Sequence, residues 1–383
     1  MAAAPTVDIC FVGSGVVNFG GTENPWNHSI RLEKLGGIRV VAIIDPLTDK
    51  ADEILQEKLA GSSSHLYKGC KVYGDIATAL KENNNIKAAF IGVPPIHHGS
   101  FSEGNDVELQ LLNGGINLFV EKPVSVIPPE QFNEYVSAVT KTAADKDCVV
   151  SVGYMFRYHP AIIRIKEEIK KYGRPLVALN ARYSCTCSNL KKVFWWNAAL
   201  SGGPIIEQAT HFCDLVRYIG GEVELDSVKG YNVPFSANPT DTGFLTSIPK
   251  VVLDADIPED KMAPCATQCV WRFKNGGIGT LTHTLLLHDH QYETGIDMWC
   301  DGLYISLLNP YLPQCTLKIR KSGSIEESVE TFPGVDTYFE EISAFMRAVS
   351  SKSEYGLIRS TYEDAAKTYE LSWAIRRATT QQK

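Results

Sequence analysis

The chain has 383 residues, of which 44% are hydrophobic and 21% are charged, and its formal net charge is −7 at pH 7. This length allows two domains with separate cores, and the composition excludes an intrinsically disordered chain. No apolar run reaches the roughly 18 residues of a membrane-spanning helix, and no basic segment offers a nucleic-acid surface. With ten scattered cysteines and no signal-peptide pattern, the sequence predicts a cytoplasmic protein with reduced thiols and no metal site.

The first predicted element is a buried strand over residues 7–12 that runs into a glycine-rich turn. The turn carries two of the three glycines of a Rossmann fingerprint, which permit a tight bend and the close approach of a pyrophosphate. The following helix offers N–H groups and the positive end of its dipole. Asn18 replaces the third glycine, which leaves open how that helix packs on the strand. The residues predicted to bind the cofactor phosphates are Gly13, Ser14, Gly15, Val16 and Val17.

A second predicted strand, residues 38–44, ends in Asp45, whose carboxylate is placed to accept hydrogen bonds from the adenosine ribose. A carboxylate at this position repels the 2′-phosphate of NADP, so the sequence predicts NAD; NADP is the weaker alternative, since Lys50 could meet a phosphate. Asp45 lies 30 residues after Gly15 instead of the usual ~20, and an insertion at residues 19–26 can account for the difference. The competing interpretation is that Asp45 caps the next helix.

Strands and helices alternate through the first part of the chain, which predicts a parallel, doubly wound sheet covered by helices on both faces. A strand near residues 88–93 ends in two prolines, which cannot donate ladder hydrogen bonds and force a sharp turn. The next strand, residues 116–120, is followed by Glu121 and Lys122, and a lysine at this place indicates a catalytic role. Both strands end at the carboxyl edge of the sheet, where ligands bind. The further predicted cofactor-binding residues are Val93, Pro94, His98, Glu121 and Lys122, all in a Rossmann domain over residues 1–155.

Residues 156–383 predict an α+β domain in which a helix precedes a large open, mostly antiparallel sheet. Stretches with a two-residue hydrophobic period lie at residues 176–185, 223–233, 267–273, 277–287, 295–300 and 302–308. Residues 234–264 contain five prolines and predict a surface insertion, either a lid or an oligomer contact. Two closing helices can pack back on the first domain. Because the outer face of an open sheet needs covering, we expect a homodimer or homotetramer through this sheet.

Glu207 and His211 stand four residues apart after a glycine-containing loop. On one helix, this spacing lets the two side chains meet. A carboxylate fixes the tautomer of an imidazole and stabilises its protonated form, which a general base requires when it removes a proton from an alcohol. The alternative is an ordinary exposed helix contact worth about 0.3 kcal/mol.

Together these motifs resemble the Gfo/Idh/MocA family of oxidoreductases over nearly the whole chain. The resemblance rests on the glycine turn, the Glu121-Lys122-Pro123 triplet, the closing helices and the segments at residues 94–98, 156–160 and 207–214. It implies an NAD(P)-dependent enzyme that transfers a hydride between nicotinamide and a secondary hydroxyl or ketone of a small carbohydrate-like substrate, such as a sugar, a polyol, an inositol or a nucleoside ribose. It also implies that Lys122 orients the hydroxyl and the nicotinamide, and that His211 takes the proton. Glu207 stands where the family often has aspartate, so its orienting role stays open.

Four further residues have competing interpretations. Arg157 follows the last Rossmann strand and could reach the cofactor, but an arginine at a domain boundary is about as often an ion-pair partner. Tyr154 could reach the substrate from the same strand end. Trp196 and His283 could also bind the substrate, although core packing is the favoured interpretation of both.

Two other functions remain as alternatives. The first is a cofactor-binding sensor without turnover, because the resemblance extends to the yeast galactose-pathway repressor. The presence of Lys122 and His211 argues against this sensor. The second is a reductase that works mainly with NADP, and Asp45 argues against it.

Overall fold

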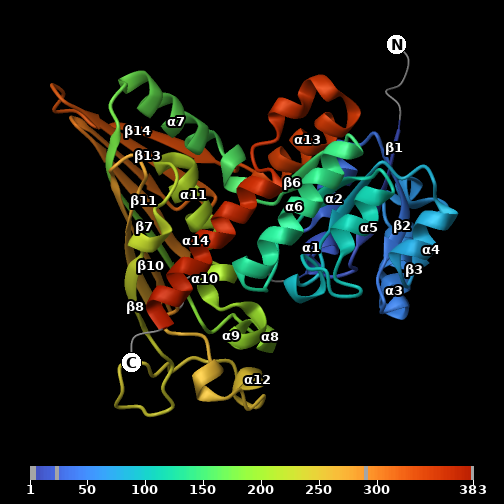
Figure 1. Ribbon diagram of the computed structural model, residues 1–383, viewed down its shortest axis with the longest axis horizontal. Helices are drawn as coiled ribbons and strands as arrows, with labels where there is room; N and C mark the ends of the chain where they lie inside the picture. The colour runs from blue at the N-terminus through green and yellow to red at the C-terminus, as the bar shows by residue number, and fades with distance from the viewer. Residues whose placement is uncertain (1–5, 22–25, 289–291, 381–383) are drawn as a thin grey trace. The chain divides into compact units, whose positions relative to one another are not determined.

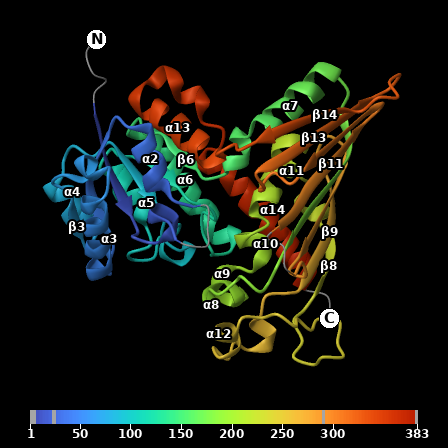
Figure 2. The same cartoon turned by 180° about the vertical axis from the view of Figure 1, so that it is seen from behind.

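The computed structural model describes residues 6–21, 26–288 and 292–380. Its internal contacts divide the chain into two compact units, each of which has its own sheet (Figures 1 and 2). The first unit comprises Met1–Met155 and Asp336–Ala366, and the second comprises Phe156–Val335 and Lys367–Lys383. No helix among the described residues is long and apolar enough to cross a membrane.

The sheet of the first unit is parallel throughout, as predicted, and its strands lie in the order β3-β2-β1-β4-β5-β6. The central strands are nearly continuous runs of buried apolar residues, as expected of strands with helices on both faces. The strands are β1 (Val7–Val12), β2 (Ile38–Ile44), β3 (Lys71–Tyr73), β4 (Ala88–Ile91), β5 (Asn117–Val120) and β6 (Val150–Val152).

The core of the first unit includes a helix from near the end of the chain. Phe345 of this helix packs edge-on against Phe90 and Phe119 of the sheet, with ring centroids 5.5 and 5.6 Å apart. The prediction assigned residues 156–383 to a second domain whose closing helices can pack back on the first. In the structure, residues 336–366, which include this helix, belong to the first unit. The predicted insertion at residues 19–26 falls between α1 and α2, and its residues 22–25 lie outside the described part of the chain. The helices are α1 (Val16–Phe19), α2 (His28–Leu35), α3 (Thr48–Ala60), α4 (Ile76–Glu82), α5 (Val107–Asn113), α6 (Pro129–Asp145) and α13 (Thr337–Ser350).

The second unit contains an eight-stranded sheet in the order β14-β13-β12-β11-β7-β10-β9-β8. Among the described strands of this sheet, only β7 and β10 pair in parallel, which confirms the predicted open, mostly antiparallel sheet. Strands β13 and β14 were not predicted. Strand β13 has a regular two-residue period, with Cys315, Leu317 and Ile319 buried, whereas edge strand β14 has no buried residue. The strands are β7 (Leu176–Cys185), β8 (Lys229–Val233), β9 (Ala266–Arg272), β10 (Ile278–Thr284), β11 (Tyr292–Cys300), β12 (Leu303–Leu308), β13 (Gln314–Lys321) and β14 (Ser328–Pro333).

Helices cover one face of this sheet, with α7 and α11 against it (Figure 2). The predicted insertion at residues 234–264 holds the short helix α12. Its end is tied to α8, because Ala263 N donates to Trp196 O at 2.8 Å. The remaining helices are α7 (Pro160–Tyr172), α8 (Val193–Trp196), α9 (Ala198–Ser201), α10 (Pro204–Glu207), α11 (Thr210–Gly220), α12 (Lys250–Leu253) and α14 (Tyr362–Thr380).

Asn18 takes the place of the missing third glycine with a buried amide. Its Nδ2 donates to Val12 O at 3.1 Å, to Gly13 O at 2.8 Å and to Phe90 O at 3.4 Å. A Cβ at Gly92 would lie 2.7 Å from this nitrogen, so only glycine leaves room for the amide. Asn18 therefore joins the glycine turn to β1 and β4 by hydrogen bonds.

We expect Asn18→Ala to lower the free energy of unfolding by about 1–3 kcal/mol, because buried carbonyl oxygens lose a donor. Urea unfolding followed by circular dichroism measures this change. Asn113→Ala alters an exposed asparagine at the end of α5 and is the matched control; it should change the free energy by less than about 0.5 kcal/mol. Equal stability of the wild type and Asn18→Ala would contradict the role of the amide.

Candidate functional site

The candidate cofactor site lies where the central strands of the first unit end. Strands β1, β4, β5 and β6 end in register, because Val12 pairs with Ile91, Ile91 with Val120, and Val120 with Val152. The next residues along these strands are Gly13, Gly92, Glu121 and Gly153. The strand order reverses between β1 and β4, and in doubly wound sheets this switch point is where ligands bind.

The glycine turn fits a dinucleotide. Gly13 has a φ of +93°, and a Cβ there would lie 2.9 Å from Val93 Cγ1, so glycine lets the turn approach the β4 loop. At Gly15 a Cβ would meet no atom of the described residues within 4 Å, which leaves space for a phosphate. Val16 and Val17 begin α1, which has only 4 residues. The prediction relied on the N–H groups of this helix and on its dipole, and a helix of 4 residues has only a small dipole.

Asp45 is held in place by the glycine turn. Its Oδ2 accepts from both the backbone N and the Oγ of Ser14 at 2.7 Å, and its Oδ1 accepts from Leu47 N at 2.9 Å. Ser14 was predicted as a phosphate-binding residue, and the structure adds this second role. Since a carboxylate has about four acceptor positions, Asp45 keeps the capacity to bind ribose hydroxyls.

Glu121 turns its side chain into the interior and fixes the backbone beside Lys122. Its Oε1 accepts from Nε2 of the fully buried His28 at 2.8 Å, and its Oε2 accepts from Lys122 N at 3.2 Å. A Cβ at Gly153 would lie 3.0 Å from Oε1, so glycine makes room for the carboxylate. The Lys122 Nζ lies 5.9 Å from the centre of the Trp26 ring. This geometry favours a positioning role for Glu121 over the predicted direct contact with the cofactor.

His98 also points inward, where it binds the fully buried Glu108. His98 Nδ1 donates to Glu108 Oε1 at 2.8 Å, and the same carboxylate accepts from Gly99 N at 3.2 Å, Tyr135 Oη at 2.8 Å and Tyr362 Oη at 3.2 Å. Burial by itself raises the pKa of Glu108, but His98 and hydrogen bonds that include the one from Tyr135 more than offset it, so the pKa lies below its ordinary value. Glu108 thus anchors the loop that follows β4.

The predicted single helix through Glu207 and His211 is wrong. Helix α10 ends at Glu207, because Ala209 N donates to Pro204 O at 2.9 Å and interrupts the i to i+4 pattern before α11 begins. Glu207 Oε2 accepts from Trp195 Nε1 at 2.7 Å. The indole of Trp195 therefore orients this carboxylate, a role that the helical spacing did not indicate.

Aromatic rings surround His211 in the first turn of α11. Its ring centre lies 5.8 Å from that of Phe156 and 6.1 Å from that of Tyr311, and Tyr311 stacks on Tyr292 at 4.9 Å. Burial raises the pKa of Tyr292 to about 12, so its hydroxyl stays protonated at neutral pH. The two tyrosines were missing from the predicted site because only the sheet and its following loop bring them to His211.

His283 is a neutral histidine of the core. It is fully buried, its Nε2 donates to Gln208 Oε1 at 3.0 Å, and its ring stacks on Tyr183 with centroids 5.3 Å apart. Burial lowers the pKa of His283 to about 3. These contacts favour the core interpretation over the predicted contact with substrate.

Arg157 forms a buried ion pair. Its Nε donates to Asp214 Oδ2 at 2.8 Å and its Nη2 donates to Asp214 Oδ1 at 2.6 Å. The structure therefore favours the ion-pair interpretation over a cofactor contact. Of the other predicted residues, Tyr154 and Trp196 are buried and Pro94 is exposed.

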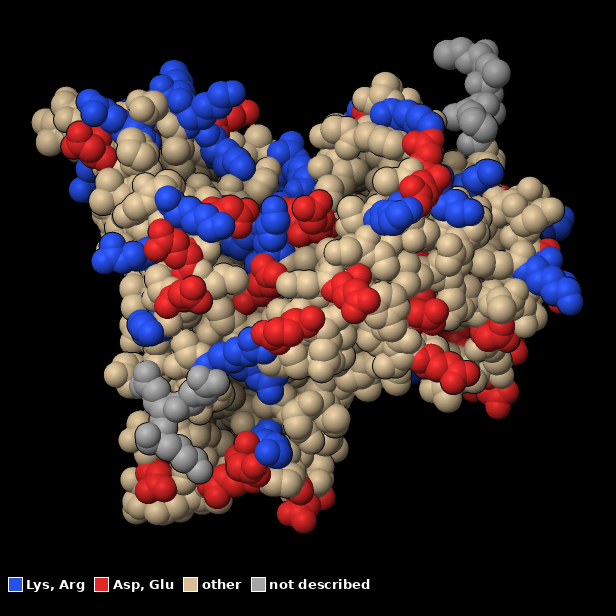
Figure 3. Space-filling model, in the orientation of Figure 1, with Lys and Arg blue, Asp and Glu red and all other residues tan. Residues whose placement is uncertain are grey.

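Lys and Arg gather over α7 and β13 in Figure 3, with acidic residues among them. Arg164 lies 2.7 Å from Glu168 and 3.3 Å from Glu330, and Lys318 lies 3.4 Å from Glu327. Several of the basic groups in this area are thus paired with carboxylates. Across the described ranges, no cluster of His, Cys, Asp and Glu side chains is arranged to hold a metal ion.

Two protein-family models match the chain. The model of the oxidoreductase family with an NAD-binding Rossmann fold, named for Gfo, Idh and MocA, matches residues 7–154. The model of an oxidoreductase C-terminal domain matches residues 157–303. An uncharacterised protein of Schizosaccharomyces pombe is 36% identical over 383 residues, which cover 98% of this chain and 92% of that protein.

Solved structures share the fold at low sequence identity. Levoglucosan dehydrogenase in complex with NADH has a TM-score of 0.73 and 15% identity, covering 97% of this chain and 96% of that one. UDP-N-acetylglucosamine 3-dehydrogenase from Acidithiobacillus ferrooxidans has a TM-score of 0.70 and 16% identity, covering 98% of each chain. Both are similar in fold to this chain over nearly their whole length.

We expect the free energy of unfolding to fall as the pH drops below about 6.5. The folded protein keeps His283 neutral because its pKa is lowered to about 3, whereas the unfolded chain takes up this proton near the ordinary value of 6.5. The contribution is fully present above pH 6.5 and is lost progressively toward pH 3. His159, whose pKa burial lowers to about 4, adds to the same trend.

Urea unfolding at pH 7, 6 and 5 tests this expectation by comparing the wild type with His283→Gln. The folding equilibrium constant should decline less steeply with falling pH in the variant. The difference between the two proteins should be roughly tenfold per pH unit. Equal slopes for the two proteins would show that His283 does not titrate on unfolding.

Proposed function

Because this chain belongs to the Gfo/Idh/MocA family and is an NAD(P)-dependent oxidoreductase, we propose that it transfers a hydride between nicotinamide and the carbon of a secondary alcohol or ketone. The proposed substrate is a small carbohydrate-like molecule: a sugar, a polyol, an inositol or a sugar moiety such as a nucleoside ribose. This substrate class is supported by Lys122, by His211 and by the aromatic side chains beside His211.

NAD is the proposed cofactor in preference to NADP. Asp45, held by Ser14 at the end of β2, keeps acceptor capacity on Oδ1, which receives a single hydrogen bond from Leu47. The two hydroxyl groups of a ribose can each donate a hydrogen bond to this carboxylate. The same fixed negative charge repels a phosphate on the ribose 2′-oxygen, which disfavours NADP.

The position of Lys122 is the observation that carries the proposal. Lys122 directly follows Glu121 at the switch-point edge of the sheet, and its backbone N is held by the buried Glu121 carboxylate. Its ammonium group can donate to a substrate hydroxyl and stabilise the negative charge that develops as the hydroxyl loses its proton. His211 accepts that proton as the general base. When bound, the nicotinamide supplies the hydride acceptor or donor.

The surroundings of His211 suit a carbohydrate substrate. The stacked rings of Tyr311 and Tyr292 provide flat apolar faces of the kind that pack on the C–H faces of sugars. Glu207, oriented by Trp195, ends α10 shortly before α11 begins and is the proposed electrostatic support of the imidazole. The proposed roles are thus a base at His211, an electrostatic support at Glu207 and an aromatic wall at the two tyrosines.

Turnover assays with Lys122→Ala test this function. Purified protein is mixed with NAD or NADP and a panel of polyols, inositols, aldoses and nucleosides, and the absorbance of reduced nicotinamide is followed. We expect turnover with NAD, and a loss of about 10²–10⁴-fold in kcat for Lys122→Ala, with NAD affinity kept within about threefold. Lys81→Ala, which alters an exposed lysine of α4, should behave as the wild type. Tight NAD binding without turnover on any panel member, in either direction, would instead favour the sensor.

We further propose that a symmetry-related copy covers the open sheet face, which makes the protein a homodimer or homotetramer. The outer face carries exposed apolar side chains at Tyr231, Val270, Ile278 and Trp299. Trp299 and Ile278 both pair with Ala178, so they lie in one row across three strands. Exposed apolar residues in neighbouring positions are typical of a surface that another chain buries.

Light scattering after size-exclusion chromatography measures the mass of the assembly. We expect Ile278→Asp to shift the protein toward the monomer, because it buries an unpaired charge in the interface. Ile325→Asp is the control, since that side chain is 102% exposed in the turn between β13 and β14. A monomeric wild type, or a variant that keeps the wild-type mass, would rule out this interface.

A further inference from the structure

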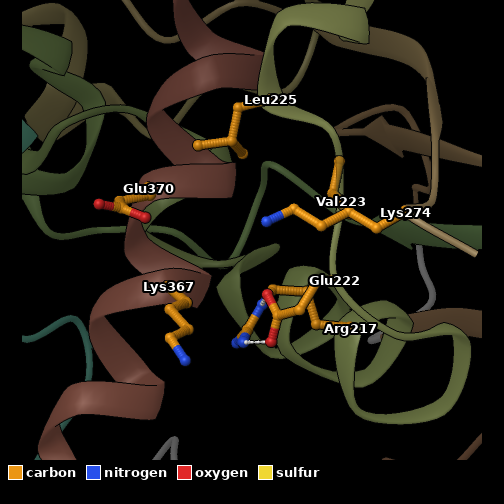
Figure 4. A pocket seen from close by; sticks show the side chains of 7 residues that line it. All are labelled: Arg217, Glu222, Val223, Leu225, Lys274, Lys367 and Glu370. Carbon is orange, nitrogen blue, oxygen red and sulfur yellow. Dashed lines mark hydrogen bonds and ion pairs between the residues drawn. The ribbon is translucent and has the colours of Figure 1, made fainter.

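A charged hollow lies in the second unit, among residues that the proposed reaction does not use. It has a volume of about 260 Å³ and lies between α11, the segment that follows it, the turn between β9 and β10, and α14 (Figure 4). Its charged lining residues are Arg217, Glu222, Lys274, Lys367 and Glu370. Three cationic groups therefore face two carboxylates.

Arg217 forms a fixed cationic part of the lining. Its side chain is 3% exposed. Its Nη2 donates to Glu222 Oε1 at 2.7 Å and its Nη1 donates to Thr368 Oγ1 at 2.7 Å. The Thr368 hydroxyl in turn donates to Asp214 Oδ1 at 3.0 Å. This network orients the guanidinium before any ligand arrives, and it commits the Glu222 carboxylate to Arg217.

The two lysines of the hollow, Lys274 and Lys367, have ammonium groups that can bind a ligand. Lys274 comes from the turn between β9 and β10 and Lys367 from α14, and Figure 4 shows the Lys274 side chain reaching toward that helix. Within the described ranges, no carboxylate lies within ion-pair distance of either ammonium group. This distinguishes them from the paired basic residues over α7 and β13. Because Arg217 engages Glu222, the other charged groups of the lining are two ammonium groups and one carboxylate, that of Glu370.

The excess of cationic groups and the size of the hollow indicate a small anion. Lysine binds phosphate as a point charge, and two ammonium groups from different elements match a dianion better than a single carboxylate. The volume is below the roughly 300–1,000 Å³ of pockets for drug-sized ligands, so the ligand is small. The apolar side chains of Val223 and Leu225 also line the hollow and can contact a short carbon chain.

We infer that this hollow binds a small phosphate dianion, either inorganic phosphate or a phosphate carried on a short carbon chain. Lys274 and Lys367 hold the phosphate oxygens, and the buried Arg217 adds positive potential. The phosphate-binding site is separate from the glycine turn, which belongs to the first unit and is proposed to hold the cofactor. It therefore allows the concentration of a phosphorylated metabolite to affect the protein without competing for the cofactor.

Isothermal titration of the full-length protein saturated with NAD tests this inference, because NAD blocks phosphate from the glycine turn. The titrants are inorganic phosphate, glycerol 3-phosphate and, as the control anion, acetate, all at constant ionic strength. We expect saturable binding of the phosphates but not of acetate. A lower Kd for glycerol 3-phosphate identifies an organic phosphate as the ligand, and equal Kd values identify the free ion.

The variants Lys274→Met and Lys367→Met each remove one ammonium group and keep the aliphatic stem. Each should weaken phosphate binding by about tenfold or more, as expected from the loss of a charge-assisted contact. Lys170→Met removes an exposed lysine of α7 and should leave the Kd unchanged. Glu370→Gln should tighten binding, since it removes the competing carboxylate, and this opposite sign separates a site effect from misfolding.

Three results would overturn the inference. The first is the absence of saturable phosphate binding. The second is binding that Lys274→Met and Lys367→Met leave unaltered, which would locate the phosphate elsewhere. The third is an equal loss in Lys170→Met, which would indicate general charge screening.

Discussion

The common level at which β1, β4, β5 and β6 end is the constraint on which the candidate cofactor site depends. The hydrogen-bond ladder continues past the strand ends, because Gly92 N donates to Val12 O, Glu121 N to Ile91 O, and Gly153 N to Val120 O. The turns that follow therefore begin side by side along one edge. These backbone hydrogen bonds, and not a side-chain contact, set the position of the backbone at Lys122, the residue after Glu121.

Buried polar groups near this edge account for much of the remaining geometry. Because a buried carboxylate needs hydrogen-bond partners, Glu121 is held by His28 and Glu108 by His98, and each pair stabilises the loop beside it. Asn18 acts in the same way through backbone carbonyl groups. Polar residues next to the proposed catalytic lysine can thus serve the site without touching a ligand, because they fix the backbone that presents this lysine.

In the second unit, the pairing of distant strands creates the surroundings of His211. The parallel pairing of β7 with β10 and the antiparallel pairing of β7 with β11 bring Tyr183 beside His283 and Tyr292. The same sheet has one face covered by helices and an opposite face with exposed apolar side chains. One face therefore supports the His211 region, and the other is the surface proposed for assembly.

The sequence by itself determined the parallel sheet, the glycine turn, the carboxylate of Asp45 and the lysine at the end of β5. These features depend on hydrophobic periodicity and on the backbone preferences of glycine and proline, which act between near neighbours in the chain. Only the tertiary structure decided that His28 binds Glu121 across 93 residues, and that α10 and α11 are separate helices. The partner of a buried polar side chain depends on which distant elements packing brings together, and no local pattern in the sequence encodes that choice.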